Sequence, residues 1–360
     1  MSRTVQRPGY TRSSRRRPPK RQLPGWALVV IDLLLTGLCL LVFAYFHHVK
    51  PKRIEGAALP TPPAIVQSGA IETDVTPYPG IESEQITSSE EETAPLSTDS
   101  QPTEAPTEEI SGAFGARFSD KFIKGDAQIS ENSYISENIN ISITRNEMDG
   151  AVYFIADIYI RDLEHLKTAF ASDSFGSASA STPEIASSHN AILAISGDYA
   201  GFRDSGLVIR NGVQYRNKVE QDICVLYYDG TMETIGQLSV NTDSILAKYP
   251  YHTWAFGPMF LNDGQPMETF NCSVNPRNPR SAIGYFEPGH YCFVTVDGRQ
   301  DGYSVGLTTQ QMSQLFFNLG CKSAYNLDGG ATAVMYFNGR TVNQPYQGGR
   351  SINDIVYIGE

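Results

Sequence analysis

The hydrophobic pattern divides the chain into three unequal parts. A continuous apolar run occupies residues 26–46, and a run of ~20 such residues is long enough for an α-helix to cross a membrane. Residues 47–112 are rich in Pro, Thr, Ser and Glu, which predicts a disordered stalk because such a segment buries little apolar surface. From residue 113 to residue 360, short apolar runs alternate with turn residues, which predicts one folded domain.

Within the folded part, β-branched and aromatic residues are concentrated in short runs, including residues 152–160 and 191–195. Such runs are typical of strands. Turn-forming dipeptides separate further apolar runs and predict hairpins. These dipeptides are Asn211-Gly212, Asp229-Gly230, Asp263-Gly264, Pro288-Gly289 and Asn338-Gly339.

Helices are expected at three places. Thr308 and Gln311 have the spacing of a capping box, apolar residues follow at helical spacing, and Gly320 can end the helix. A second helix is expected to start at residues 181–184, where a proline lies in the first turn. A third is expected after Asp162. The predicted fold class is therefore α+β, a mixed and mainly antiparallel sheet with a few helices, preceded by one transmembrane helix and the stalk.

Charge is distributed unevenly along the 360 residues. The first 53 residues carry a net charge of +10, residues 54–110 carry −12, and the remainder carries −9. The basic residues precede the apolar run, so they indicate a cytoplasmic tail over residues 1–25 rather than nucleic-acid binding. The positive-inside rule then predicts a single-pass membrane protein whose C-terminal domain is extracytoplasmic. A cleaved signal peptide is the less favoured alternative because the run is longer than a signal core.

One of the five cysteines, Cys39, lies in the apolar run. The other four are Cys224, Cys272, Cys292 and Cys321, an even number in a compartment that permits disulfides. Four cysteines allow three pairings, and buried free thiols are an equal alternative. Their spacing does not suggest a zinc site.

Acidic residues beside glycine follow several predicted strands, and most such pairs are ordinary turns. Asp328 differs because it ends an apolar run and is followed by Gly329 and Gly330. Glycines allow a ligand to approach the backbone closely and expose amides that bind anions. Asp297 and Asp198 also follow apolar runs. We therefore expect Asp328 to be catalytic and Asp297 and Asp198 to orient substrate or act as bases.

Two arginines are the candidates for binding an anionic group. Arg280 begins an apolar run, and Arg350 follows a pair of glycines near the C-terminus. A guanidinium donates two parallel hydrogen bonds to phosphate, and a net-negative domain needs such positioned cations to hold an anion. The sequence therefore predicts a pocket in which these arginines lie beside Asp328. Whether several of the acids also hold a divalent cation is left open.

Eight motifs occur in a fixed order over residues 191–360: AISGDYAGF, LVIRNGVQY, AFGPMFLNDG, PRSAIGYF, FVTVDGRQ, GLTTQQM, AYNLDGGATAVMYFNG and GGRSINDIVYI. In this order they resemble the phosphodiester glycosidase family. Two positions depart from the family pattern: Ser196 stands where asparagine is usual, and the DGGGS run reads DGGAT over residues 328–332. The resemblance implies that Thr332 supplies the hydroxyl that serine usually gives.

The resemblance implies hydrolysis of sugar-1-phosphate diesters, which releases a sugar and a phosphomonoester. The expected substrate is an N-acetylglucosamine-1-phosphodiester or a similar carbohydrate phosphodiester of cell-envelope or exopolysaccharide glycans. Two other classes stay open because a fold does not fix a function. One is a non-catalytic module that binds envelope polysaccharide on the same scaffold, and the other is a membrane sensor of wall material.

Overall fold

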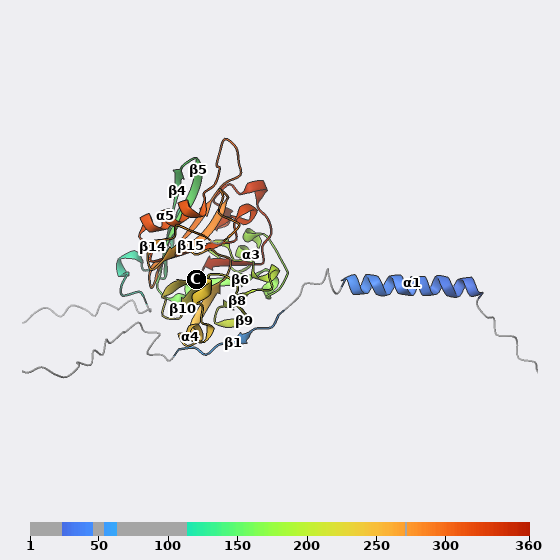
Figure 1. Cartoon of the computed structure of the whole chain (residues 1–360). Helices are drawn as coiled ribbons and strands as arrows, with labels where there is room; N and C mark the ends of the chain where they lie inside the picture. The colour runs from blue at the N-terminus through green and yellow to red at the C-terminus, as the bar shows by residue number, and fades with distance from the viewer. Residues whose placement is uncertain (1–23, 46–53, 63–113, 271) are drawn as a thin grey trace, which may run out of the picture. The chain divides into compact units, whose positions relative to one another are not determined.

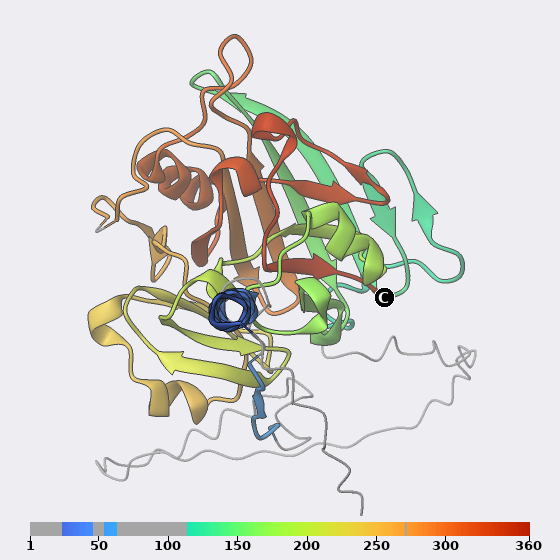
Figure 2. The same cartoon turned by 90° about the vertical axis from the view of Figure 1, so that its right-hand side faces the viewer.

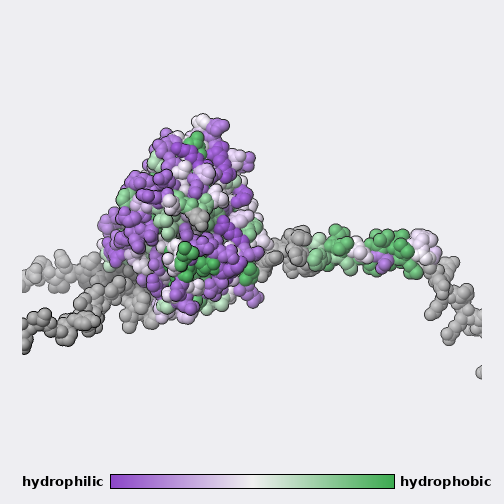
Figure 3. All heavy atoms as spheres, in the orientation of Figure 1, coloured by the Kyte–Doolittle hydropathy of each residue, from purple (hydrophilic) through white to green (hydrophobic). Residues whose placement is uncertain are grey.

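The computed structural model describes residues 24–45, 54–62 and 114–360 except residue 271. Two units are distinguished, residues 1–51 and residues 52–360. In the first unit, α1 (Gly25–Ala44) is an uninterrupted helix of 20 residues that contains an 18-residue window with a mean hydropathy of 2.7. Its side chains are hydrophobic along most of its length (Figure 3). Its length and composition suffice to cross a membrane, as the sequence predicted for residues 26–46.

The second unit is built on two larger and three smaller antiparallel sheets (Figures 1 and 2). The seven-stranded sheet has the order β17 (Ser323–Leu327), β15 (Arg280–Glu287), β16 (His290–Val296), β5 (Ala151–Ile160), β4 (Ile139–Met148), β3 (Ser133–Ile135), β2 (Gln128–Ile129). The five-stranded sheet has the order β19 (Arg340–Thr341), β18 (Met335–Phe337), β7 (Leu193–Ser196), β20 (Asp354–Ile358), β6 (Leu166–Phe170).

The smaller sheets carry the middle of the chain. One has the order β11 (Met232–Ile235), β10 (Ile223–Tyr227), β12 (Pro250–Trp254), another β1 (Ala57–Ala58), β9 (Val213–Lys218), β8 (Gly206–Arg210), and the last pairs β13 (Leu261–Asn262) with β14 (Gln265–Pro266). Three further α-helices are described: α3 (Thr182–Ser188), α4 (Thr242–Leu246) and α5 (Thr309–Leu319). Every strand pairing in the described ranges is antiparallel, and the predicted α+β class is confirmed.

Alternating side chains place the core on both faces of the seven-stranded sheet. In β5, Phe154, Ala156 and Ile158 belong to the main core cluster, together with residues of the five-stranded sheet. Tyr153 lies in the second cluster, on the opposite face, where α5 packs. This two-residue period is the geometric consequence of the pleat. At about 25 cal/mol per Å² of buried apolar area, these two layers supply the main stabilisation of the domain.

Helix α5 starts and ends where the sequence predicts. The Thr308 side chain accepts from the Gln311 amide, and the Gln311 side chain accepts from the Thr308 amide, so the capping box is complete. Gly320 ends the helix with a φ of 84°, a left-handed conformation that suits glycine. Helix α3 also has the predicted start, with Ser181 as its N-cap and a full capping box.

All five predicted hairpin turns are present, at β8–β9, β10–β11, β13–β14, β15–β16 and β18–β19. At Asn211-Gly212 both residues have positive φ, 50° and 74°. Two consecutive positive φ angles define the hairpin turn that Asn-Gly favours. The turn chemistry of the sequence was therefore sufficient to locate these strand connections.

The helix predicted after Asp162 is wrong. Residues Leu163–His165 form one 3₁₀ turn, η3, and the chain then continues as β6. The apolar residues that suggested a helical face instead pair with β20, with Leu166 opposite Ile358. The β-branched strand β20 lies nearly two hundred residues away, so this tertiary pairing overrides the local pattern.

Residues 54–62, which belong to the predicted stalk 47–112, are described and include β1 (Ala57–Ala58). β1 pairs with β9, with Ala57 opposite Gln214, and the Leu59 amide donates to the Gly212 carbonyl at 2.9 Å. A short apolar segment can therefore add to the edge of β9 even inside a polar sequence. Residues 63–112 of the predicted stalk lie outside the described residues.

The four cysteines of the second unit are free in the structure, and three of them, Cys224, Cys292 and Cys321, are buried. The Sγ atoms of Cys292 and Cys321 are 3.9 Å apart. Of the two alternatives that the sequence left open, the structure corresponds to the free thiols that pack as small apolar residues.

Candidate active site

Three neighbouring strands bring candidate residues to the same edge of the seven-stranded sheet. Asp328 follows the end of β17, Arg280 begins β15, and Asp297 follows the end of β16. β15 lies between the other two strands and runs antiparallel to both. Adjacent strands are about 4.8 Å apart, so these three positions, far apart in sequence, are close in space.

Asp328 is fixed through its backbone. Its amide donates to the Gly197 carbonyl at 2.8 Å, and its carbonyl accepts from the Ser196 hydroxyl at 2.6 Å. The Ser196 hydroxyl also lies 2.8 Å from that of Ser281 on β15. Ser196, which stands where the family usually has asparagine, thus joins the two larger sheets beneath Asp328. Asp328 also lines a pocket, together with Arg280.

Asp328 is only 5% exposed. Burial raises its pKa to about 6, opposed by the Arg350 charge, the Thr332 hydroxyl and the Arg203 charge. Arg350 Nη2 lies 3.4 Å from Asp328 Oδ2. A carboxyl group with this pKa is ionised at neutral pH and still accepts a proton readily, which suits a general base.

Arg280 is 2% exposed. Its guanidinium donates to the carbonyls of Leu307, Val274 and Pro276 at 3.0, 2.5 and 2.6 Å. Within the described residues it forms no ion pair with a carboxylate. Burial lowers the pKa of Arg280 to about 10, so the group stays charged at neutral pH. A buried cation without a protein counter-ion is a suitable partner for an anionic ligand.

Asp328 and Arg280 line one pocket of about 190 Å³, here named the Asp328 pocket. Its remaining lining residues are Phe256, Val274, Asn278, Pro279, Arg299, Asn326, Gly329 and Gly330. The pocket therefore combines one carboxylate with two guanidinium groups and a glycine-containing turn. That combination is able to hold a phosphate beside a base.

Gly329 and Gly330 let the chain turn tightly beside Arg280. A Cβ on Gly329 would lie 2.7 Å from the Pro279 carbonyl oxygen, and Gly330 has a φ of 68°. The Gly330 amide donates to that same carbonyl at 2.9 Å. The amide of Gly329 therefore stays a candidate for binding phosphate, whereas Gly330 contributes through its conformation.

Arg299 lines the Asp328 pocket but was not singled out from the sequence. Its guanidinium donates to Asn278 Oδ1 at 3.0 and 2.8 Å and lies over the Tyr346 ring at 5.5 Å. Its φ of 58° is unusual for a residue with a side chain. The run Asp297-Gly298-Arg299 contained the signal, because arginine directly after a strand-ending Asp-Gly turn is placed at the sheet edge.

Asp198 lies behind the pocket rather than in its lining. Its Oδ1 accepts from Arg210 Nη2 at 2.7 Å, and its Oδ2 accepts from the Ala255 amide at 2.8 Å. Arg210 also donates from Nε and Nη2 to Asp354 Oδ2 at 3.1 and 2.9 Å. All three side chains are about 1% exposed or less. We call Asp198, Arg210 and Asp354 the Arg210 triad.

The Arg210 triad fixes the loop that supports Asp328. Asp354 Oδ1 accepts from the Asp198 amide at 3.2 Å, next to Gly197, whose carbonyl binds the Asp328 amide. Burial raises the pKa of the Asp354 carboxyl, and the nearby Arg210 guanidinium opposes this. Arg210 and Asp354 were missed in the sequence, although an arginine that ends the apolar run GLVIR is a sign of a buried charge.

The Asp297 carboxylate is held by hydrogen bonds from neighbouring residues. Its carboxylate accepts from the Tyr303 hydroxyl at 2.8 Å, Asn343 Nδ2 at 2.7 Å and the Gln344 amide at 3.0 Å. Burial raises its pKa, and those three donors oppose the rise. Tyr303, Asn343 and Gln344 line a different pocket of about 410 Å³. Asp297 is therefore adjacent to the Asp328 pocket without lining it.

The last two predicted residues lie close to Asp328 with different exposure. The Arg350 side chain is 54% exposed and lies over the Tyr199 ring at 5.7 Å as well as near Asp328. Thr332 is fully buried, and its hydroxyl donates to the Gly329 carbonyl at 2.7 Å. Thr332 thereby fixes the turn after Asp328, while Arg350 remains accessible to a ligand.

The acidic candidates do not cluster in the described part of the chain. No group of three or more His, Cys, Asp or Glu side chains is arranged there to hold a metal ion. The candidate acids are instead separated by their partners: Asp198 by Arg210, Asp297 by Tyr303 and Asn343.

Comparisons with known proteins find similarity over the same region of the chain. Residues 189–359 match the model of the phosphodiester glycosidase family. The chain is 33% identical over 163 residues to the SPbeta prophage-derived uncharacterized protein YomE of Bacillus subtilis strain 168, covering 42% of this chain and 25% of that protein. It is 28% identical over 97 residues to N-acetylglucosamine-1-phosphodiester alpha-N-acetylglucosaminidase of Bos taurus, covering 25% of this chain and 18% of that protein.

Among solved structures, the catalytic domain of the zebrafish N-acetylglucosamine-1-phosphodiester alpha-N-acetylglucosaminidase superposes with a TM-score of 0.52 at 19% identity, covering 66% of this chain and 89% of that one. This likeness shows a shared fold. The chain spans a quarter or less of the length of the curated relatives it matches. The family resemblance of the sequence motifs is thereby confirmed: residues 189–359 match the phosphodiester glycosidase family.

Proposed function

We propose that this protein hydrolyses sugar-1-phosphate diesters of the N-acetylglucosamine-1-phosphodiester type in cell-envelope or exopolysaccharide glycans. The products would be the free sugar and a phosphomonoester. One observation carries the proposal: a buried carboxylate with a raised pKa, Asp328, shares a pocket with a buried arginine that has no carboxylate partner in the described residues, Arg280. The family match and the named activity of the bovine relative support it.

In the proposed reaction, water attacks the anomeric carbon of the sugar while the bond from that carbon to the phosphate oxygen breaks. Asp328 accepts the proton of the attacking water and later loses it to solvent. The bonding electrons leave with the phosphate, which departs as a phosphomonoester dianion. Arg280, Arg299 and the Gly329 amide bind that developing charge, and such preorganised donors usually contribute most to the rate.

The remaining candidates act through position. Asp198, as part of the Arg210 triad, and Thr332 hold the two chain segments that fix Asp328. Asp297 holds the strand end beside Arg280 through Asn343 and Tyr303. Arg350 lies at the open side of Asp328, where it lowers the pKa of that carboxyl and can contact the phosphate or the sugar.

The proposed cellular arrangement follows from the N-terminal pattern. Residues 1–25 would lie in the cytoplasm, α1 would cross the membrane, and the domain would be extracytoplasmic, since the basic residues precede the apolar run. The acidic, proline-rich segment over residues 63–112 would then act as a spacer. Accessibility of Lys121 to a membrane-impermeant amine reagent on intact cells tests this orientation.

The test of function is the replacement Asp328→Asn in the full chain, purified in detergent. Wild-type protein should release a phosphomonoester from a synthetic N-acetylglucosamine-1-phosphodiester, with and without chelator. Asp328→Asn should lower kcat by roughly 10²–10⁴-fold, the range of a general base. Asp263→Asn, in the exposed β13–β14 turn, is the matched control and should keep full activity.

Two outcomes would contradict the proposal, the first its assignment of Asp328 and the second the enzymatic activity itself. Equal turnover by Asp328→Asn and wild type would remove Asp328 from the reaction. Binding of the diester by folded wild-type protein without any turnover would instead indicate the non-catalytic carbohydrate-binding module.

A further inference from the structure

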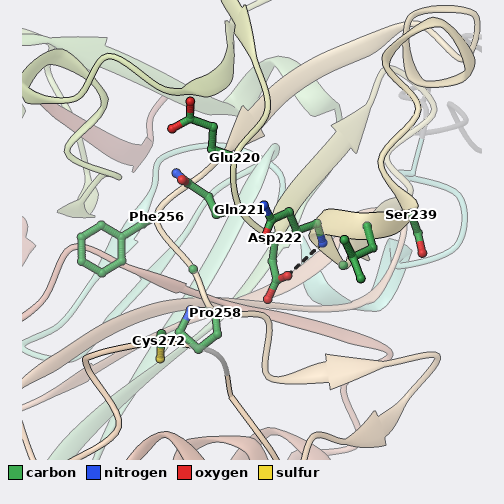
Figure 4. Close-up of a pocket in the computed structure, with 11 residues that line it drawn as sticks. Glu220, Gln221, Asp222, Ser239, Phe256, Pro258 and Cys272 are labelled. Carbon is green, nitrogen blue, oxygen red and sulfur yellow. Dashed lines mark hydrogen bonds between the residues drawn. The ribbon is translucent and has the colours of Figure 1, made fainter.

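A second and larger pocket adjoins the Asp328 pocket. It measures about 420 Å³, within the range of ligand-binding pockets. Its side chains come from the segments before β10, around η6 (Gln237–Ser239) and after β12, as Figure 4 shows. We name it the Asp222 pocket; it is lined by Glu220, Gln221, Asp222, Ser239, Phe256 and Pro258, among others.

The two pockets are connected through Phe256 and Gly257. Phe256 lines both of them, and Arg203 lies over its ring at 4.6 Å, which holds the ring in place. Gly257, in the Asp222 pocket, accepts a hydrogen bond from Asn326 Nδ2 of the Asp328 pocket at 2.8 Å. The two pockets therefore lie on either side of Phe256, next to each other.

The charges of the two pockets are opposite. Arg280 and Arg299 line the Asp328 pocket, whereas Glu220 and Asp222 line the Asp222 pocket. Glu220 forms an exposed ion pair with Lys218 at 2.8 Å, so Asp222 is the carboxylate that gives the Asp222 pocket its negative charge. Asp222 is held in place because its carboxylate accepts from the Gln237 amide at 3.0 Å and the Met259 amide at 3.4 Å. An anionic group would thus be favoured in one pocket and disfavoured in the other.

Asn326 adds an unused acceptor at the junction. It is 1% exposed and lines the Asp328 pocket, and its Oδ1 atom has no hydrogen-bond partner among the described residues. A buried acceptor without a donor is costly, so a ligand that supplies a hydroxyl or amide donor here would relieve that cost. Sugars carry many such donors, and their apolar ring faces pack on aromatic side chains.

We propose that the Asp222 pocket binds the sugar ring whose anomeric carbon is attacked, and that it selects neutral or amino sugars over acidic ones. The inference rests on the proposed function and adds the identity of the subsite. In the transition state, negative charge gathers on the leaving phosphate and positive charge on the sugar ring. The arginines at the phosphate end and the Asp222 carboxylate at the sugar end match this distribution.

The first test fills the pocket. Ser239 is exposed in η6 and lines the pocket, so Ser239→Trp should block it without disturbing the core. Ser187→Trp on the exposed face of α3 is the matched control. With N-acetylglucosamine-1-phosphodiesters bearing either a methyl or a sugar group on the far side of the phosphate, Ser239→Trp should lower kcat/KM at least 10-fold for both. A loss confined to the sugar-bearing diester would overturn the assignment, because the pocket would then hold the other end.

The second test measures charge selectivity. Wild type should prefer an N-acetylglucosamine-1-phosphodiester over the glucuronic acid equivalent at least 10-fold, and Asp222→Asn should reduce this preference while its melting temperature stays within a few degrees of wild type. Equal preference in the variant and in wild type would contradict the role of Asp222.

A binding measurement separates this inference from the proposed reaction. Saturation-transfer NMR with free N-acetylglucosamine should show binding to the full-length wild-type protein and to Ser187→Trp, but not to Ser239→Trp. If the sugar binds in this pattern but diesters are not cleaved, the proposed subsite is supported and the proposed hydrolytic function is wrong. If diesters are cleaved but Ser239→Trp binds and turns over normally, the subsite is wrong and the hydrolytic function stands.

Discussion

Replacement of Arg350 by alanine should move the acid limb of the pH–rate profile to higher pH. The Asp328 carboxyl must be ionised to accept a proton, so activity is lost as pH falls through its pKa of about 6. Among the groups that oppose the rise in this pKa, the Arg350 charge is the largest. Without that charge the carboxyl protonates more easily, and the loss of activity begins at a higher pH.

The size of the shift follows from the geometry. The Arg350 side chain is 54% exposed and its Nη2 lies 3.4 Å from Asp328 Oδ2, so the interaction is screened by solvent. In a medium with the dielectric constant of water, two unit charges at this distance interact by about 1.2 kcal/mol. That energy corresponds to roughly 0.9 pKa unit. The acid limb should therefore move from near pH 6 to near pH 7.

The assay is kcat/KM against pH for an N-acetylglucosamine-1-phosphodiester, since this ratio reports the pKa of the free enzyme. Arg117→Ala is the matched control, because Arg117 forms an ion pair of similar length, 3.3 Å, and similar exposure with Glu287. The shift for Arg350→Ala should shrink as salt rises. An unchanged limb, or a move to lower pH, would refute the assignment of this limb to Asp328.

Three predictions concern the scaffold, each measured by urea unfolding of the full chain in detergent. Arg210→Met should lower the free energy of unfolding by about 3–5 kcal/mol because it leaves two carboxylates of the Arg210 triad buried without a partner; a loss below 1 kcal/mol would contradict this. Gly284→Ala should cost about 1–3 kcal/mol, since its Cβ would lie 2.7 Å from Cys292 Sγ and 2.8 Å from Phe316; an unchanged midpoint would show that the site can relax. Thr308→Ala should cost about 1 kcal/mol through the lost cap of α5, and Thr308→Ser should restore most of it.

The parts of the fold that were predicted correctly depend on contacts close in sequence. The Asn211-Gly212 turn and the Thr308 capping box need only a few neighbouring residues, and both are present as expected. The prediction of a helix after Asp162 was wrong because the structure of this segment depends on its pairing with β20. The strand formed by Ala57 and Ala58 was not predicted for the same reason, since its partner β9 lies more than 150 residues away. A local pattern contains no information about such partners.

The candidate site shows the same division between local and distant information. Asp328, Gly329 and Arg280 could be chosen from the sequence because each stands at the end of an apolar run, where strands deliver side chains to a sheet edge. The groups that contact each carboxylate could not be predicted from the sequence in this way. Asp198 and Asp328 follow similar apolar runs, yet Arg210 and Asp354 surround the first and a pocket surrounds the second. Only the packing of β8 and β20 separates the two.

Ser196, which departs from the expected asparagine, forms hydrogen bonds within the surrounding structure. Its hydroxyl reaches the Asp328 carbonyl and the Ser281 hydroxyl, and all of these groups are buried. The side chain at this position therefore positions the Asp328 backbone and does not line the Asp328 pocket. The hydroxyls of Ser196 and Ser281 thereby join the two larger sheets. The departure at residue 196 consequently concerns how Asp328 is held, while the groups that face a ligand, Asp328 and Arg280, are retained.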